Sequence, residues 1–225
     1  MNLLSTTIAL SLSNTRLFTT NLPTNQLDTP AVYKEQHAAT KAGAINKHDI
    51  LPVVTIRHPY RWMQSMCKNP YSAKWPHFTK CPRLLRDNGV TWNNVTVKYG
   101  AASDGYQSLA HLWNDWYHQY WTADYPFIMI RMEDLVFQTK ATIATVCECA
   151  GGVLRTDRPF QYVADSAKKD SPGHDTTTGY AEAWIKYSQP LAPRAGFAED
   201  DYEASVQVLD SDLMQRFGYQ HPSKA

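Results

Sequence analysis

Short apolar runs and longer stretches of periodically spaced apolar residues follow one another along this chain. The run Val53, Val54 and Ile56 is short and β-branched, which is typical of a strand covered on both faces. Residues 126–131, with the sequence PFIMIR, indicate a second buried strand. Each run leads directly into a segment with helical features, so the pattern predicts two strand-to-helix units.

Three segments have the apolar spacing of amphipathic helices. The first, Gly105–Trp121, places five large apolar residues on one face, and we expect this face, including its two tryptophans, to be core. The second starts at Met132 with acidic residues, which suit a helix N-terminus, and stops at Gly151. The third begins near Glu199. The apolar positions of the first helix are Tyr106, Leu109, Trp113, Trp116 and Tyr120. Those of the third helix are Tyr202, Val206, Leu209, Leu213 and Phe217.

The first strand-to-helix unit carries the chemistry of an anion site. Arg57 follows the strand at its carboxyl end, where open α/β sheets bind ligands. Pro59 suits the first turn of the next helix, and Ser65 lies about two turns into it. A guanidinium and a hydroxyl can therefore converge on one phosphate. The alternative interpretation is a structural pair between Arg57 and a carboxylate, with Ser65 on the surface.

This order of strand, arginine, proline and helix serine resembles the 3′-phosphate motif of sulfotransferases that use PAPS (3′-phosphoadenosine 5′-phosphosulfate). The segment Ile130-Arg-Met-Glu-Asp-Leu135 and the ending Phe217-Gly-Tyr219 are similar to later segments of that family. The resemblance implies an α/β fold, with a mainly parallel sheet flanked by helices, of the sulfotransferase and P-loop nucleoside-triphosphate-hydrolase type. It also implies transfer of a sulfuryl group from PAPS, without a metal, to a hydroxyl acceptor such as a carbohydrate, with Arg57 and Ser65 binding the cofactor.

The resemblance suggests further roles for basic residues. His48, just before the first strand, corresponds to the family's acceptor base, and Lys47 corresponds to the lysine near the transferring group. The alternative for both is a solvated loop. Lys168, Lys169 and Lys186 match the family's late basic residues only by their place in the carboxy-terminal half, and they can equally be solvated.

One expected family element is missing from the sequence. A PAPS sulfotransferase begins with a strand and a glycine-rich, lysine-containing loop that holds the 5′-phosphosulfate. Residues 1–46 contain one glycine, Gly43. We therefore expect a truncated, spliced or degenerate form with little or no activity. Residues 1–30 are rich in Ser, Thr, Asn and Leu without clear periodicity, so we expect them to be a loosely ordered or unrelated leader, with residues 31–222 as the domain and 223–225 as a tail. A non-catalytic remnant that binds a nucleotide or a protein is the alternative function.

Composition limits the partners and the cellular location. The chain has 225 residues, 43% of them apolar, which suffices for one domain with a sizeable core. Its net charge of +1 argues against nucleic-acid binding. No run approaches the roughly 18 apolar residues that cross a bilayer, so we expect no transmembrane segment in this form. The resemblance implies the Golgi lumen for a longer form that carries an anchor, and the cytoplasm is the alternative.

The four cysteines leave both locations open. Cys67 and Cys81 flank an aromatic, proline-containing loop and can form a disulfide in a lumenal protein, or stay reduced in a cytosolic one. Cys147 and Cys149 share one helix, where bridging is geometrically unfavourable. Asn94-Val-Thr96 is a glycosylation sequon, a triplet that also arises by chance.

Other chemistries find little support. His111 and His118 can share a helix face, but no third metal ligand has suitable spacing. The chain has no Gly-x-Ser-x-Gly elbow of an α/β-hydrolase and no Cys-x-x-Cys redox pair. A P-loop kinase is the nearest competing enzyme class, and it requires the same missing loop together with Mg²⁺-binding acids.

Overall fold

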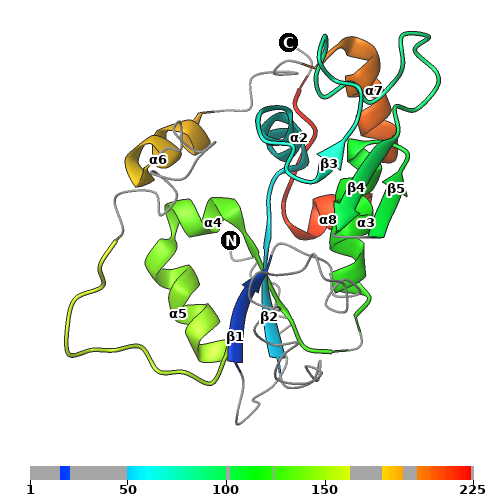
Figure 1. Cartoon of the computed structure of the whole chain (residues 1–225). Helices are drawn as coiled ribbons and strands as arrows, with labels where there is room; N and C mark the ends of the chain where they lie inside the picture. Colours follow the sequence, from blue (N-terminus) through cyan, green and yellow to red (C-terminus); the bar gives the residue numbers. More distant parts are fainter. Residues whose placement is uncertain are drawn as a thin grey trace.

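The structure is a computed structural model of the chain, and it describes residues 16–20, 50–99, 102–123, 125–162, 179–189 and 197–223. The proposed catalytic pair Lys47 and His48 lies outside these ranges, as do Lys168 and Lys169. The described elements, drawn in Figure 1, are β1 (Arg16–Thr20), β2 (Ile50–Ile56), α2 (Pro59–Lys68), β3 (Ala73–Lys74), β4 (Val95–Tyr99), β5 (Ala102–Tyr106), α3 (Leu109–Trp121), β6 (Ile128–Arg131), α4 (Met132–Phe137), α5 (Thr139–Cys149), α6 (Tyr180–Ser188), α7 (Glu199–Val208) and α8 (Ser211–Arg216).

A parallel sheet forms the centre of the molecule. Its strand order is β1-β2-β6, and β2 pairs in parallel with both neighbours. Val54 and Ile56 are fully buried, so the predicted strand is confirmed, and it begins earlier, at Ile50. Because Ile56 lies opposite Arg131, the carboxyl ends of β2 and β6 meet at one edge of the sheet. The fold class is therefore α/β, with a small parallel sheet and helices.

Two of these strands differ from the sequence-based prediction in extent. The second predicted strand, residues 126–131, is confirmed as β6 over Ile128–Arg131, and its side chains are half-buried. Residues 16–20 fall in the segment expected to be a leader. They form β1, which aligns Thr19 with Val53 of β2.

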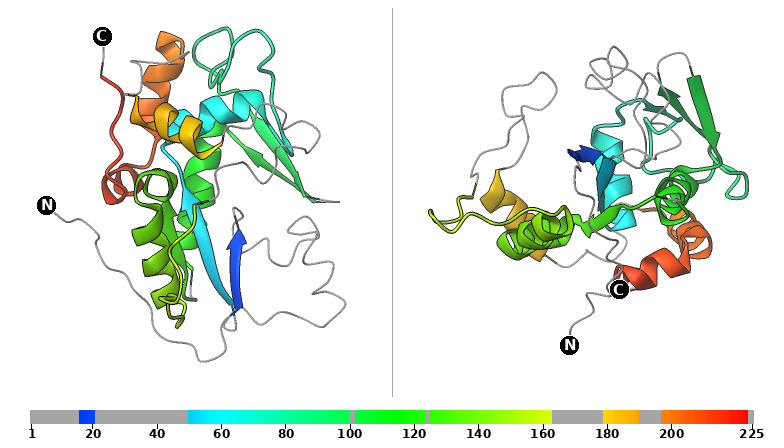
Figure 2. Two further views of the ribbon diagram at one scale, coloured as in Figure 1. Left: turned by 90° about the vertical axis from the view of Figure 1, so that its left-hand side faces the viewer. Right: turned by 90° about the horizontal axis from the view of Figure 1, so that it is seen from below.

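Helices lie on both sides of this sheet. Figures 1 and 2 show α4 and α5 on one side of β2, and α3 and α8 on the other. Apolar side chains from both strands and helices form the core, and Trp113 of α3 is its largest fully buried member. Trp116, expected beside it in the core, is half-buried against the cluster. No helix in the described ranges is long and apolar enough to cross a membrane.

A second, antiparallel sheet of order β3-β4-β5 was not predicted. Gly105 and Tyr106, assigned from their spacing to a helix, belong instead to β5 and pair with Thr96 and Val95 of β4. The helix α3 begins only at Leu109, because the side chain of Ser108 accepts a hydrogen bond from the backbone of His111 and caps it. The prediction of a helix from Gly105 was wrong by one turn.

The two other predicted helices are each broken into two. Gln138 separates α4 from α5, and the apolar residue Ile143 of α5 is exposed. Asp210 separates α7 from α8, because its side chain accepts hydrogen bonds from the backbone N–H groups of Asp212 and Leu213, each at 2.9 Å. An aspartate cap inside an apolar repeat starts a new helix, and apolar spacing alone does not reveal it.

Candidate anion-binding site

The turn after β2 is fixed by hydrogen bonds from aromatic side chains. Three consecutive backbone carbonyls accept one bond each, from a residue of α3 or of the carboxyl-terminal segment. The donors are the Tyr117 hydroxyl to Thr55 at 3.1 Å, the Tyr219 hydroxyl to Ile56 at 3.2 Å, and the Trp113 indole N–H to Arg57 at 3.1 Å. Buried carbonyls that find such partners hold the backbone in place. The start of the Arg57 side chain is thereby positioned at the sheet edge.

The helix α2 separates its apolar and polar residues onto two faces. Tyr60, Met63 and Met66 are buried in the core. Arg61, Ser65 and Lys68 follow at positions i, i+4 and i+7, so they share the opposite face. The Ser65 hydroxyl makes no hydrogen bond to another residue in the described ranges. This face therefore presents two cations and a hydroxyl beside Arg57.

The helix α6 lies against this face. Arg61 donates hydrogen bonds to the carbonyl oxygens of Lys186, at 3.1 Å, and Gln189, at 2.6 Å. These carbonyls belong to the carboxyl end of α6, where a helix carries partial negative charge and attracts a guanidinium. The guanidinium carbons of Arg57 and Arg61 lie 5.3 Å and 5.4 Å from the centroid of the Tyr187 ring. Both arginines thus make cation–π contacts with one tyrosine.

Contacts with α4 hold the other end of α6. The Tyr180 hydroxyl donates to the carbonyl oxygen of Val136 at 2.9 Å. The Trp184 ring meets Phe137 edge-on, with centroids 5.9 Å apart. Figure 1 shows α6 beside α4, and the bonds from Arg61 join its carboxyl end to the first turn of α2. The position of Lys186 and Tyr187 therefore depends on two neighbouring helices.

We refer to Arg57, Arg61, Ser65, Lys68 and Lys186 as the strand-end cluster. Partial burial lowers the pKa of Lys186, and the positive charges of Arg57, Lys68 and Arg61 lower it further. The ion pairs among the described residues use other cations, namely Lys80, Arg83, His118, Arg131 and Arg155. None of the four cations of the cluster has a carboxylate partner in that part of the chain. Such a group of like charges favours an anionic ligand.

Glu133 is the acid whose charge acts on the strand-end cluster, and its oxygens are already engaged. Burial lowers the pKa of Arg61 below its ordinary value, and the negative charge of Glu133 offsets part of this effect. One carboxylate oxygen accepts from the His58 backbone N–H at 3.3 Å, and the other accepts from the Tyr219 hydroxyl at 2.9 Å. Burial, together with this carboxylate, raises the pKa of Tyr219. Glu133 thus joins α4, the β2–α2 turn and the carboxyl-terminal segment.

His58 occupies the turn between Arg57 and α2. Burial lowers its pKa to about 4, with Arg61 and Arg131 adding to the effect, so the ring is neutral at pH 7. Its Nε2 lies 3.1 Å from the carbonyl oxygen of Gln220 and, in the neutral ring, carries the proton that it donates there. The other nitrogen, Nδ1, is buried without a hydrogen-bond partner among the described residues. A neutral, enclosed imidazole packs the turn and adds no charge to the cluster.

The structure brings together some of the residues selected from the sequence and adds others. Arg57 makes its contact with Tyr187, and Lys186 joins it from α6. Ser65 lies one turn beyond Arg61 on the same helix face. Arg61, Lys68 and Tyr187 were missed. The spacing of residues 61, 65 and 68 along one helix face could have revealed Arg61 and Lys68. Tyr187 could not be found in this way, because nothing in the sequence shows that α6 docks on α2.

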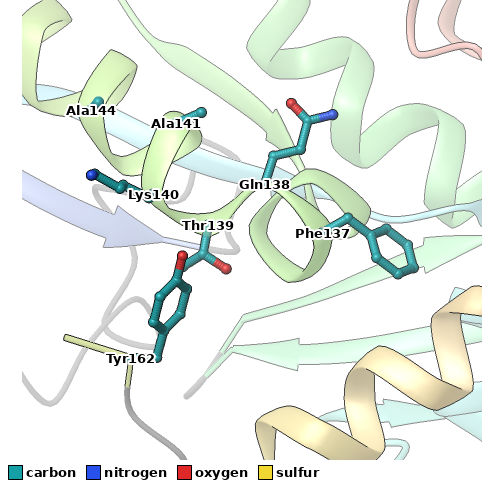
Figure 3. Close-up of a pocket in the computed structure, with 7 residues that line it drawn as sticks. All are labelled: Phe137, Gln138, Thr139, Lys140, Ala141, Ala144 and Tyr162. Atoms are coloured by element: carbon teal, nitrogen blue, oxygen red, sulfur yellow. The ribbon is translucent and has the colours of Figure 1, made fainter. Parts of the chain in front are cut away.

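A pocket of about 470 Å³ lies elsewhere, at the junction of α4 and α5. Figure 3 shows Tyr162 reaching from a separate segment towards Thr139, while the Phe137 and Lys140 side chains point away from one another. Its lining has one basic residue, Lys140, and none of the strand-end cluster. Its lining is less suited to an anion than the strand-end cluster.

No group of three or more potential metal ligands occurs in the described ranges. The strand-end cluster presents cations and a hydroxyl at the edge of a parallel sheet. Comparisons with protein-family models, curated proteins and solved structures find no match to this chain.

Proposed function

We propose that the chain is a sulfotransferase-type domain that binds PAPS at the strand-end cluster and transfers its sulfuryl group to a hydroxyl acceptor, such as a carbohydrate. One observation carries this proposal. Four cations, Arg57, Arg61, Lys68 and Lys186, gather at the carboxyl edge of β2 without a carboxylate partner among the described residues. This is the edge at which open α/β sheets bind their ligands.

The types of side chain suit a phosphate. Arginine presents planar pairs of N–H donors that match phosphate oxygens, and a serine hydroxyl adds a further donor. Arg57 is held at the strand end by the bond from Trp113 to its carbonyl, and Ser65 lies on the adjacent helix face. Lys68 and Lys186 contribute longer-range attraction. We assign Arg57 and Ser65 to the 3′-phosphate of PAPS.

The transfer step requires further groups. The acceptor oxygen attacks sulfur, the bond from sulfur to the phosphate oxygen breaks, and the acceptor proton passes to a base. We propose His48 as this base and Lys47 as the cation near the moving group, although both lie outside the described residues. Since the sequence has no glycine-rich phosphate loop in residues 1–46, we expect little or no turnover by the 225-residue chain.

A specific observation favours the second candidate, a nucleotide-binding module without catalysis. The acid and the imidazole that line the β2–α2 turn are both engaged, Glu133 by two hydrogen bonds and His58 by burial and Gln220. Neither is available to accept a proton from an acceptor hydroxyl. An assay with radiolabelled PAPS and a panel of sugar and phenol acceptors separates the candidates. Turnover that Arg57→Ala abolishes supports the transferase, and binding without turnover supports the module.

Isothermal calorimetry with PAP, the desulfonated cofactor, tests the site itself. Arg57→Ala removes a charged hydrogen-bonding group worth about 1.5–3 kcal/mol, which corresponds to roughly a 10- to 150-fold loss of affinity. Ser65→Ala removes a neutral bond worth about 1 kcal/mol. Arg86→Ala, at an exposed arginine outside the cluster, serves as the charge-matched control. Equal PAP affinity in the wild type and a folded Arg57→Ala variant would overturn the assignment.

A further inference from the structure

The outer face of the antiparallel sheet carries a triplet that the proposed function does not use. Asn94-Val95-Thr96 is the single Asn-x-Ser/Thr triplet in the 225-residue sequence. Asn94 and Thr96 are exposed, whereas Val95 between them is fully buried. Successive side chains of a strand point to opposite faces, so the asparagine and the threonine project from the same face. An N-linked glycan is bulky and lies on the protein surface, so its asparagine must face solvent in the folded chain, as Asn94 does.

The neighbouring residue Asn93 has a structural role, in contrast to Asn94. Asn93 is 3% exposed, and its side-chain amide donates to the carbonyl oxygens of Pro76, at 2.8 Å, and Arg83, at 3.0 Å. Asn94, in contrast, makes no side-chain hydrogen bond to any residue of the described ranges. The amide nitrogen that would accept a sugar is thus not occupied by the fold.

The sheet also leaves room beside the triplet. Thr96 pairs with Gly105 of β5 on one side and with Lys74 of β3 on the other. Gly105 has no side chain, and a Cβ built there would meet no atom within 4 Å. Lys74 is exposed and can turn its long side chain into water. The face around Thr96 is therefore open to a bulky substituent.

An independent feature indicates the compartment in which such a modification occurs. Cys67 and Cys81 form a disulfide with a Cα separation of 5.9 Å, which joins the end of α2 to the loop between β3 and β4. Disulfides of this kind form and persist in the oxidising secretory pathway and are rare in the cytosol. The same pathway attaches glycans to asparagine. The sequence left both a Cys67–Cys81 bridge and two reduced thiols open, and the structure has the bridge.

We propose that the chain matures in the secretory pathway and carries an N-linked glycan on Asn94. The donor is an oligosaccharide held on a lipid diphosphate. The Asn94 amide nitrogen forms a bond to the anomeric carbon of the first sugar, the bond from that carbon to the diphosphate oxygen breaks, and the lipid diphosphate leaves with the electron pair. The amide nitrogen gives up one proton to a basic group of the transferase. Thr96 supplies the hydroxyl that the transferase recognises.

The position of the glycan is compatible with the strand-end cluster. Figures 1 and 2 place β4 on the opposite side of α2 from α6, which carries Lys186. Asn94 directly precedes β4, so a glycan on it is attached on the side of α2 that lies away from α6.

The test produces the full chain from its own coding sequence in eukaryotic cells and treats it with peptide-N-glycosidase. The wild type and Thr96→Ser should lose the mass of one oligosaccharide, and peptide mass spectrometry should place it on Asn94. Asn94→Gln and Thr96→Ala should show no such loss, with an unchanged circular dichroism spectrum and thermal midpoint. Labelling under denaturing, non-reducing conditions should find two reactive thiols.

Two results would overturn the proposal. A wild-type chain whose mass does not change on enzyme treatment would show that Asn94 is not an acceptor, and a mass change that persists in Asn94→Gln would place the glycan elsewhere. Four reactive thiols in the chain isolated from these cells would show that it does not mature in an oxidising compartment.

Discussion

Replacement of Trp113 tests how the core supports the proposed site. The side chain is fully buried, meets Tyr117 edge-on at 5.2 Å, and donates its indole N–H to the Arg57 carbonyl at 3.1 Å. Trp113→Ala removes a large buried ring and leaves a cavity, so it should lower the free energy of unfolding by about 3–5 kcal/mol. Trp113→Phe keeps most of the packing but leaves the Arg57 carbonyl without its donor, which costs about 1–3 kcal/mol.

Urea unfolding followed by far-ultraviolet circular dichroism measures these differences. Trp184→Ala is the matched control, because Trp184 is 48% exposed and its contact is one edge-on pair with Phe137. Aromatic pairs of this kind contribute about 0.5–1.5 kcal/mol, so the control should lose about 1 kcal/mol. If Trp113→Ala were no more destabilising than Trp184→Ala, our account of the core and of the Arg57 anchor would be wrong.

Three further predictions follow from particular contacts. Replacing Cys67 and Cys81 by serine opens a disulfide with a sequence separation of 14, so the free energy of unfolding in a urea titration should fall by about 3 kcal/mol. An unchanged free energy of unfolding would contradict a stabilising bridge. The pKa of His58 is about 4 in the folded chain and 6.5 ordinarily, so the unfolded chain takes up the proton first as the pH falls. The contribution of His58 to the free energy of unfolding is therefore complete above pH 6.5, and this free energy should fall by on the order of 2–3 kcal/mol as the pH drops to 4. His58→Asn should lack this part of the acid sensitivity, and a parallel loss in both proteins would exclude it. Arg61→Ala, which breaks the bonds to the end of α6, should accelerate amide exchange throughout Tyr180–Ser188, whereas the control Arg86→Ala should not.

The sequence was sufficient to predict the element that positions the site. A short β-branched run, a strand-end arginine and a proline at the first helical position are local features, and β2 and α2 follow them. The apolar face of α3 was equally readable, because Trp113 and Tyr120 repeat at helical spacing and both are fully buried. Periodicity predicts such elements well when each one packs against the core through a single face.

The errors in the fold arose where a polar contact overrode the apolar pattern. Asp210 caps α8 in the middle of a regular repeat, and Ser108 caps α3 after its first apparent turn. The antiparallel sheet was missed because β4 and β5 are short, and their stability depends on pairing with each other rather than on a strong local pattern. Such pairing is a long-range property that periodicity does not encode.

The site was predictable in part for a related reason. Arg57 and Ser65 lie in one local unit, so their relation follows from strand and helix geometry. Lys186 and Tyr187 come from α6, more than a hundred residues along the chain, and reach Arg57 because α6 is held both by Arg61 and by contacts with α4. Their contribution depends on tertiary docking. Site residues that come from a distant helix can be identified only when the packing of that helix against the site is known.

The most direct test of the central claim is a cycle of two ligands and two proteins measured by calorimetry. PAP and adenosine 5′-monophosphate differ in the 3′-phosphate, and the wild type differs from Arg57→Ala in the guanidinium proposed to bind it. We expect PAP to bind the wild type more tightly than the monophosphate, and Arg57→Ala to weaken PAP by roughly 10-fold or more while changing the monophosphate little. An equal effect of Arg57→Ala on both ligands, or equal affinity of the wild type for both, would contradict the account.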